Sequence, residues 1–409
     1  MMGDAAFEIV LAWMVIKSTG SIAALTMILL FQAVPRGILM PLGGAIVDRL
    51  SPRNVMLVAH LARAFAFTAI TAVAITGTPS VWQLCALALL MGVAAAFFMP
   101  ASESILPALV PEEHLGRANA FQGVFEQASF LVGPLLGGAL IASVGPWSVF
   151  ALNAATFFLA SLTLLAAPLS RPEPTESLSP RQVAREIAEG LGHAKRSHEV
   201  RLVLAIICAA TLSYSGVFAV GLPALAQTMG DAMALGVIVS GWGAGQIVGV
   251  LLATMTGLPR RWGVLIIGMN VVEAGMFAAL GFMPTAWAAA ALLFVVGIGV
   301  AYSSDVALPT FIQTQTPRHL LGRISALLGL PRVVLEPLSI ALLGLVLTRS
   351  IQWGFLVAAI PVLLVGAALA LDPKARTLSA SPSEKSAHET SEPSQADVGP
   401  GSAGASNSD

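Results

Sequence analysis

The sequence predicts an all-α membrane protein built from two related six-helix halves, and three observations carry this prediction. The chain of 409 residues is 56% hydrophobic and only 11% charged, a balance that soluble domains of this length do not have. Its apolar residues fall into long runs separated by short polar connections. A short motif from the first half of the chain also recurs in the second half.

Apolar segments follow one another along the whole chain, near 5–16, 22–47, 54–76, 81–109, 119–143, 147–167, 202–229, 233–256, 263–283, 286–311, 323–348 and 352–371. A helix needs about 20 apolar residues to cross a bilayer, and every segment except 5–16 reaches that length. The chain must nevertheless turn at 17–20 for the later spans to alternate in direction. We therefore expect the first helix to be truncated here and to begin upstream of Met1.

The positive residues predict which ends of the helices face the cytoplasm, because Lys and Arg concentrate in cytoplasmic connections. Of the 21 Lys and Arg residues, those on one alternating set of connections are Arg49, Arg53, Arg117, Arg171, Arg181, Arg185, Lys195, Arg196, Arg201, Arg260, Arg261, Arg318, Arg323, Lys374, Arg376 and Lys385. The opposite connections hold only Lys17 and Arg349. The pattern predicts a multi-pass protein of the plasma (inner) membrane with a cytoplasmic C-terminus.

One long connection, 168–201, divides the spans into a half at 1–167 and a half at 202–372. Within it, Val183, Ile187 and Leu191 lie four residues apart among charged residues, which predicts an amphipathic helix on the membrane surface.

The repeat supports this division, because Pro111–Arg117 recurs as Pro317–Arg323, in each case between the fourth and fifth span of a half. Two related halves are common in secondary transporters, where the binding site lies between them. The tail, 373–409, has no aromatic residue and is expected to be disordered and cytoplasmic.

Composition also argues against several functions. The net charge of −1 gives no nucleic-acid-binding surface. Cys85 and Cys208 lie in apolar runs, with neither disulfide nor metal-ligand spacing. His60 stands alone near the start of the third span and is expected at the membrane interface. Since no nucleophile–base arrangement or phosphate loop is visible, we expect a non-enzyme without a cofactor or metal.

Acidic residues inside the predicted spans are functional candidates, because a charge at mid-span costs about 2.5–3.5 kcal/mol. They are Asp4, Glu8, Glu103, Glu126, Glu273, Asp305 and Glu336. Asp4 and Glu8 lie four residues apart on one helix face, where they could hold a proton or a cation. Glu103 is close enough to the inner interface to be solvated, and Glu273 has no evident role.

The fifth span has the most informative pattern. Gln122, Glu126, Ser129 and Gly133 share one helix face, and Pro134 permits a bend after them. A polar stripe on an apolar helix must face protein or a cavity. We expect this face to line a cavity with Glu126 as a proton carrier; the alternative is a fixed ion pair of Glu126 with Arg36 or Arg63.

Other spans supply further cavity candidates. Gln32 and Arg36 form a polar pair on the second span, where Arg36 could meet an anionic substrate group or neutralise an acidic side chain. Tyr302 and Asp305 belong to a polar cluster in the tenth span. Arg332 and Glu336 lie four residues apart in the eleventh span and are expected to pair with each other. The proton-coupling candidates are thus Glu126, Asp305, Glu8 and Asp4, and the substrate-cavity candidates are Gln32, Arg36, Gln122, Ser129, Tyr302, Arg332 and Glu336.

Two motifs resemble the major facilitator superfamily, over nearly the whole chain except the tail. Gly44-x-x-x-Asp48-Arg49-x-x-x-Arg53 is similar to that family's cytoplasmic loop motif between spans 2 and 3. The resemblance implies a conformational latch between the halves, formed by Gly44, Asp48, Arg49 and Arg53. Gly43, beside the motif, is small enough to let the second span approach a neighbour closely.

The segment Gly133-Pro134-x-x-Gly137-Gly138 resembles the core of the antiporter motif of drug–proton exporters. The fuller motif has two further glycines, whose places here are taken by Ser129 and Ala120. The run 115–139, together with Gly3-Asp4, is most similar to the macrolide- and siderophore-exporter branch of the superfamily.

The resemblance implies a proton-coupled exporter of amphipathic organic compounds that works by alternating access. Such an exporter would contribute to multidrug resistance. Its expected partners are a small-molecule substrate, protons and the lipid bilayer, and the protein is expected to be a monomer that does not bind nucleic acid. Two alternatives stay open: an uptake symporter on the same fold, and a membrane sensor or scaffold that does not transport.

Overall fold

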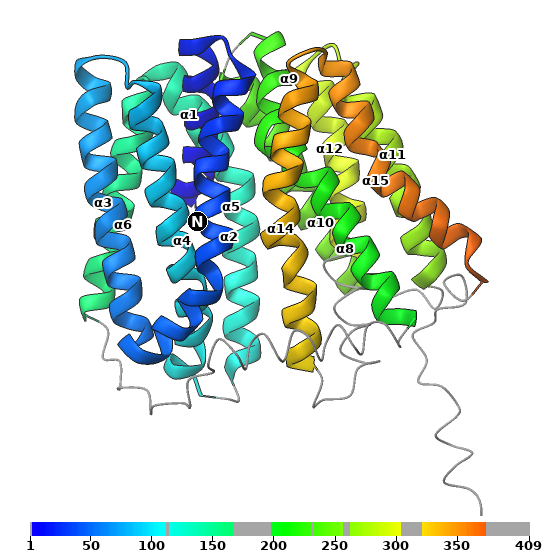
Figure 1. The fold of residues 1–409 in the computed structure, drawn as a ribbon, viewed down its shortest axis with the longest axis horizontal. Helices are drawn as coiled ribbons and strands as arrows, with labels where there is room; N and C mark the ends of the chain where they lie inside the picture. The colour runs from blue at the N-terminus through cyan, green and yellow to red at the C-terminus, as the bar shows by residue number, and fades with distance from the viewer. Residues whose placement is uncertain are drawn as a thin grey trace, which may run out of the picture.

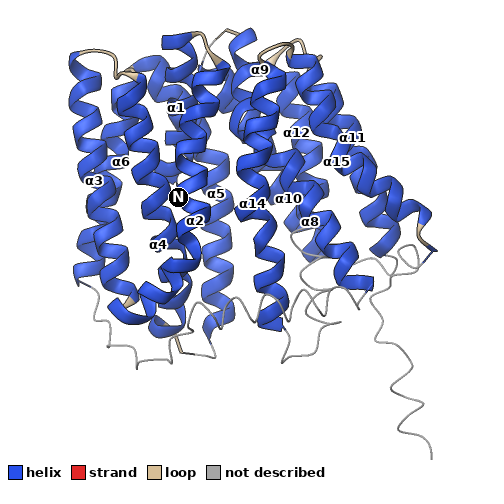
Figure 2. Ribbon diagram, viewed as in Figure 1, coloured by secondary structure: helices blue, strands red, loops and turns tan. Residues whose placement is uncertain are grey.

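The computed structural model describes residues 2–111, 114–166, 198–230, 232–256, 262–303 and 321–373. In this part of the chain the regular structure is entirely helical (Figures 1 and 2). The first half of the chain forms α1 (Met2–Thr19), α2 (Ile22–Leu50), α3 (Pro52–Thr76), α4 (Val81–Leu109), α5 (Leu115–Ser143) and α6 (Pro146–Ala166). We call these helices the N-terminal half.

The second half of the chain forms α8 (His198–Gly216), the π-helix η2 (Val217–Gly221), α9 (Leu222–Thr228), α10 (Ala232–Thr256), α11 (Trp262–Leu280), α12 (Ala286–Val300), α14 (Leu321–Leu347) and α15 (Ile351–Leu371). We call these the C-terminal half. Eleven helices of the described chain are long and apolar enough to cross a membrane. This number agrees with the apolar segments of the sequence, and α1 is the shorter twelfth helix expected at 5–16.

Local signals set the helix boundaries. The Ser21 hydroxyl accepts a hydrogen bond from the Ala24 N–H (3.2 Å) and caps α2, and Ser350 caps α15 in the same way. The connection between α2 and α3 is a single residue, Ser51, with φ of 70°. Asp48 and Arg49 therefore lie in the last turn of α2, and the loop expected there is shorter than its sequence suggests.

The two halves repeat the same packing of helices. In the N-terminal half α2 packs along α4 and α3 along α6, and in the C-terminal half α10 packs along α12 and α11 along α15. Glycine allows the closest of these contacts. A Cβ on Gly43 would lie 2.2 Å from the carbonyl oxygen of Ala96, and one on Gly245 would lie 2.1 Å from that of Phe294. The close approach expected at Gly43 is therefore confirmed.

Substituting Gly92 tests this packing, because a Cβ there would lie 2.1 Å from the carbonyl oxygen of Gln32. We expect Gly92→Val to separate α2 from α4 and to destabilise the protein by about 3 kcal/mol or more. Gly268→Val is the matched control, since a Cβ on Gly268 has no neighbour within 4 Å. Thermal unfolding of the two purified variants in detergent measures the difference, and equal melting temperatures would contradict the packing described here.

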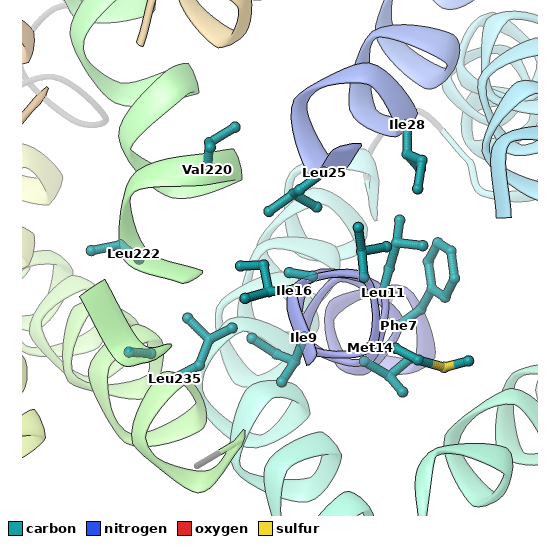
Figure 3. Packing of buried hydrophobic residues seen from close by; sticks show 14 of the residues in the cluster. Phe7, Ile9, Leu11, Met14, Ile16, Leu25, Ile28, Val220, Leu222 and Leu235 are labelled. Atoms are coloured by element: carbon teal, nitrogen blue, oxygen red, sulfur yellow. The ribbon is translucent and has the colours of Figure 1, made fainter. Parts of the chain in front are cut away.

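Helix α1 lies at the centre of the bundle. Phe7, Leu11 and Ile16 are at most 2% exposed. Figure 3 shows the side chains of α1 meeting Leu25 and Ile28 of α2 on one side and residues of η2, α9 and α10 on the other. The chain begins inside the bundle, near mid-height (Figure 1). The first two turns of α1 are thus deep between the halves, which determines where Asp4 and Glu8 lie.

Candidate functional site

The halves contact each other along two helix pairs, and the first pair is α5 with α10. A Cβ on Gly138 would lie 3.1 Å from the carbonyl oxygen of Ala232, and one on Gly236 would lie 2.7 Å from that of Pro134. Farther along, the Ser240 hydroxyl donates a hydrogen bond to the Leu131 carbonyl at 2.7 Å. These contacts leave no room for side chains between the two helix backbones.

The second pair is α2 with α14. A Cβ on Gly344 would lie 3.0 Å from the Cβ of Thr26, and one on Gly37 would lie 2.9 Å from the carbonyl oxygen of Val333. Both helix pairs therefore meet near the bundle end that carries the α1–α2 and α5–α6 turns. We call this the closed end.

Toward the other end the halves separate. Phe121, Val124 and Phe125 of α5 are 61–66% exposed, and their neighbours Gln122, Gly123 and Glu126 are exposed as well. A whole turn and a half of α5 is therefore uncovered on every side. We call this the open end; it also carries the connection between α2 and α3 (Figure 1).

A group of charged residues lies where the contacts between the halves stop. Arg36 of α2 forms an ion pair with Glu336 of α14, so that the pair joins the two halves, and both side chains are about a quarter exposed. Glu8 of α1 interacts electrostatically with Arg36, Glu336 and Asp4. We call Asp4, Glu8, Arg36 and Glu336 the central charged group.

Glu8 is exposed although its neighbours Phe7 and Ile9 are buried. Helix α1 is surrounded by α2, α5, α6, η2, α9 and α10. An exposed carboxylate on such an enclosed helix borders a water-accessible space inside the bundle. The central charged group is therefore within reach of water and of small solutes.

A second polar cluster lies within the N-terminal half. Arg63 of α3 is 4% exposed and stacks between Phe98 and Phe157, with its guanidinium carbon 5.1 and 5.4 Å from the ring centres. Asp4 acts electrostatically on both Arg63 and His60. His60 is buried against the same two rings, so its expected place at the membrane interface is wrong. The rings shield these polar groups from lipid.

The ion pair expected within α14 is also wrong. Glu336 pairs with Arg36 on the opposite half, whereas Arg332 is exposed one turn nearer the open end. Arg36 therefore forms its ion pair with Glu336 and not with Glu126, the partner that the sequence analysis gave as an alternative. Contact between α2 and α14 decides this pairing, and no spacing within either helix could reveal it.

The stripe on α5 is divided between two environments. Gln122 and Glu126 are exposed near the open end. Ser129 is buried, and its hydroxyl donates to the Phe125 carbonyl one turn earlier (2.7 Å), while Gly133 is buried as well. Only the part of the stripe nearest the open end is thus free to line a space.

The antiporter-like motif lies where α5 is held between two helices. A Cβ on Gly137 would lie 3.0 Å from the Ala6 carbonyl oxygen on α1, whereas Gly138 faces α10 across the halves. Gly133 and Pro134 are buried beside them. The small residues of the motif therefore let α5 pack against α1 and α10 together.

The remaining sequence candidates lie at different depths in the bundle. Gln32 is partly buried one turn before Arg36 on α2. Tyr302 is partly buried, and its hydroxyl lies 3.0 Å from that of Thr256 at the end of α10. Glu273 is buried in α11. Several predictions fall on residues outside the described ones. They concern Asp305, the amphipathic helix of 181–199 as far as residue 197, the second copy of the repeat as far as residue 320, and the tail after Pro373.

Arg53 of the proposed latch binds within its own half. Its Nε and Nη2 atoms donate to the carbonyl oxygens of Leu164 and Leu165, at 2.8 and 2.7 Å, and cap the last turn of α6. Gly44, Asp48 and Arg49 lie in the last turns of α2. Within the described residues, the hydrogen bonds of Arg53 thus join α3 to α6.

Sequence reasoning missed an aromatic cluster in the C-terminal half. The ring centres of Tyr214 and Phe218 lie 5.5 and 5.0 Å from that of Trp242, and Tyr214 also contacts Phe277 edge-on.

Gln246, one turn after Trp242, is 4% exposed, and its Oε1 atom has no hydrogen-bond partner within the described residues. The π-helix η2, which begins at Val217, adds a residue to the turn that carries Phe218. Aromatic residues are common in apolar spans, so the sequence gives no signal for this cluster.

A helical bundle whose halves meet at one end around a charged, water-accessible centre has the architecture of a secondary transporter. In the described part of the chain, no group of His, Cys, Asp or Glu residues could hold a metal ion. The chain belongs to the Major Facilitator Superfamily, whose family model matches residues 1–331. This membership makes the protein a secondary transporter rather than an enzyme.

Several relatives are efflux proteins. The chain is 25% identical over 381 residues to the multidrug efflux pump Tap of Mycolicibacterium fortuitum, covering 90% of this chain and 91% of that one. It is 23% identical to macrolide efflux protein A of Streptococcus pyogenes (85% and 86% covered). It is 28% identical to the enterobactin exporter EntS of Citrobacter koseri (74% and 71%).

A solved structure supports the fold independently. The chain superposes on the crystal structure of a D-xylose-proton symporter with a TM-score of 0.65, covering 92% of this chain and 98% of that chain. The two sequences are 13% identical, so this likeness concerns the fold alone.

Proposed function

We propose that the protein exports amphipathic organic compounds across the plasma (inner) membrane in exchange for protons, by alternating access. The observation that carries the proposal is the central charged group, held between halves that touch at one end and separate at the other. In the proposed orientation the open end, with its Arg-containing connections, is cytoplasmic. Efflux proteins related over most of the chain favour this direction of transport.

Charge balance supports coupling to protons. The central charged group holds three carboxylates, those of Asp4, Glu8 and Glu336, and one guanidinium, that of Arg36. Arg36 is taken by Glu336, and Asp4 also interacts with Arg63, so Glu8 is the carboxylate whose charge is least balanced by the protein. A proton from one side of the membrane, or a substrate from the other, would balance it in turn.

Accumulation assays test the proposal. We expect energised cells that express the protein to accumulate less of several dyes and macrolides than cells without it, and a protonophore to remove the difference. Glu8→Gln should abolish export, because it removes the carboxylate at the centre. The matched control is Glu103→Gln, since Glu103 is exposed on α4 and should tolerate the loss of its charge.

Glu126→Gln tests the carboxylate on α5 separately, and we expect a smaller loss of export than with Glu8→Gln, since Glu126 lies where the halves are apart. Export that survives Glu8→Gln unchanged would exclude Glu8 from coupling. Unchanged accumulation of every compound by the unmodified protein would contradict export itself and favour uptake or a non-transporting role.

A further inference from the structure

The hydroxyl of Ser339 on α14 lies within the hydrogen-bond ladder of α8. It accepts a hydrogen bond from the Gly216 N–H at 2.9 Å and donates one to the Leu212 carbonyl at 2.6 Å. These two α8 groups are four residues apart, the spacing at which an α-helix bonds its own N–H and carbonyl groups directly. A side chain of α14 is therefore inserted between two groups that α8 would otherwise join by itself.

The backbone around Gly216 is shaped for this insertion. Ser339 is 3% exposed, and Gly216 is buried. A Cβ on Gly216 would lie 2.8 Å from the carbonyl oxygen of Ser339 and 2.9 Å from the Cβ of Leu343. The glycine thus lets α14 come close enough for the hydroxyl to enter α8.

The helix geometry changes immediately after the insertion. The π-helix η2 begins at Val217, and the Leu222 N–H bonds to the Val217 carbonyl five residues earlier. Pro223 follows and has no N–H to offer the Ala219 carbonyl, so an α-helical ladder would lack a bond here too. The α and π geometries of this segment are therefore closer in free energy than in an uninterrupted helix, and one hydrogen bond can decide between them.

The segment η2 contacts both halves of the protein. The ring centre of Phe218 lies 5.0 Å from that of Trp242 in the C-terminal half. The same segment contacts α1 and α2 of the N-terminal half, and Figure 3 shows Val220 among the side chains where these helices meet. A change from π to α geometry would turn these side chains about the helix axis and so alter the contact between the halves.

Helix α14 connects Ser339 to the ion pair between the halves. Glu336, which pairs with Arg36 of α2, lies three residues before Ser339. Pro331 and Pro337 lie inside α14 and interrupt its own ladder, so α14 can bend near Ser339 when the ion pair opens. Such a bend concerns α14 and α8 and leaves the contact of α11 with α15 as it is.

We propose that Ser339 is a positioning residue that holds η2 in its π geometry while the closed end is shut, and that its withdrawal lets this segment close into an α-helix as the halves separate. The hydroxyl acts through η2, whose two geometries favour different contacts between the halves. The inference rests on the proposed function, because it assigns this change to the transport cycle.

Hydrogen–deuterium exchange of the purified full-length protein in detergent tests the role of the hydroxyl without a substrate. In Ser339→Ala the Leu212 carbonyl and the Gly216 N–H can bond directly. We therefore expect the backbone amides of 212–222 to exchange at least about fivefold more slowly than in the unmodified protein. Faster or unchanged exchange would overturn the proposal, because a hydroxyl that only tied two helices together would leave α8 looser when removed.

Two further comparisons separate this role from a general effect on stability. Ser161→Ala is the matched control, since Ser161 is 2% exposed on α6 and its hydroxyl donates to the Phe157 carbonyl of its own helix. It should leave the exchange of 212–222 unchanged. Arg36→Gln opens the ion pair between the halves from a different helix, and it should slow exchange of the same segment. Arg332→Gln, at an exposed position of α14, should not.

Unchanged exchange in Arg36→Gln would overturn the link between η2 and the separation of the halves. Export by Ser339→Ala, measured in the accumulation assay, is expected to fall at least about threefold, because one of the two geometries is overpopulated. Full export by Ser339→Ala would overturn the role in the cycle. Slower exchange in both variants, together with no export by the unmodified protein, would support the two geometries of η2 and contradict the proposed function.

Discussion

Reversing the charge of either member of the Arg36–Glu336 pair is expected to stop transport, and reversing both is expected to restore it. Arg36→Glu would place two carboxylates at the contact between α2 and α14, and Glu336→Arg would place two guanidinium groups there. The double variant rebuilds the same attraction with the partners exchanged. Substrate flux in proteoliposomes with a pH gradient measures all three variants.

The size of the effect follows from the partial burial of the pair. Breaking a buried ion pair by removing one partner costs about 3–5 kcal/mol, and exposed pairs contribute about 1 kcal/mol or less. With side-chain exposures of 26% and 21%, we expect about 2 kcal/mol, or about thirtyfold in the population of the state seen here. Because like charges repel, each single charge reversal should destabilise this state by more than about 2 kcal/mol.

A second exchange serves as the control. Arg332→Glu combined with Glu336→Arg keeps the net charge of α14, but it places an arginine opposite Arg36. We expect this variant to remain inactive. Restoration by this exchange would mean that the net charge of α14 matters more than its contact with α2, and failure of the Arg36→Glu/Glu336→Arg variant would mean that the two side chains have separate roles.

Most of the fold could be predicted from the sequence, because membrane helices obey strong local rules. The length of the apolar runs and the alternation of positive residues determine how many helices there are and in which direction each runs. Eleven candidate spans agree with the predicted number of long apolar helices. The connection at Ser51 was harder to predict, since a one-residue turn with positive φ depends on the packing of α2 and α3 and not on composition.

The candidate site was only partly predictable for a different reason. Sequence spacing identifies residues on one helix face, which is why Asp4 with Glu8 and Gln32 with Arg36 could be grouped. It does not say which helices touch across the halves, so the partner of Glu336 was assigned to the same helix. The aromatic cluster was missed because its members come from η2, α8, α10 and α11, far apart in the chain.

A disulfide across the closed end should trap the protein in the state described here. The Cβ of Thr26 lies 3.0 Å from the Cβ position of Gly344, about 0.5 Å less than the shortest separation in disulfides, so a small outward shift of the two helices would let the bond form. We expect Thr26→Cys with Gly344→Cys, in a background without Cys85 and Cys208, to lose transport on oxidation and to recover it with a reductant. Separation of α2 from α14 is required if the halves rock to open this end.

The matched control joins two helices of the same half. The Cβ of Asn270 on α11 lies 3.1 Å from the Cβ position of Gly366 on α15, nearly the same separation. We expect the disulfide between Asn270→Cys and Gly366→Cys to form equally well and to leave transport intact, because rigid-body rocking does not change distances within a half. If both disulfides stopped transport, movement within the halves would be needed as well. If neither did, α2 and α14 would stay together throughout the cycle, and the closed end would have to open between α5 and α10 alone.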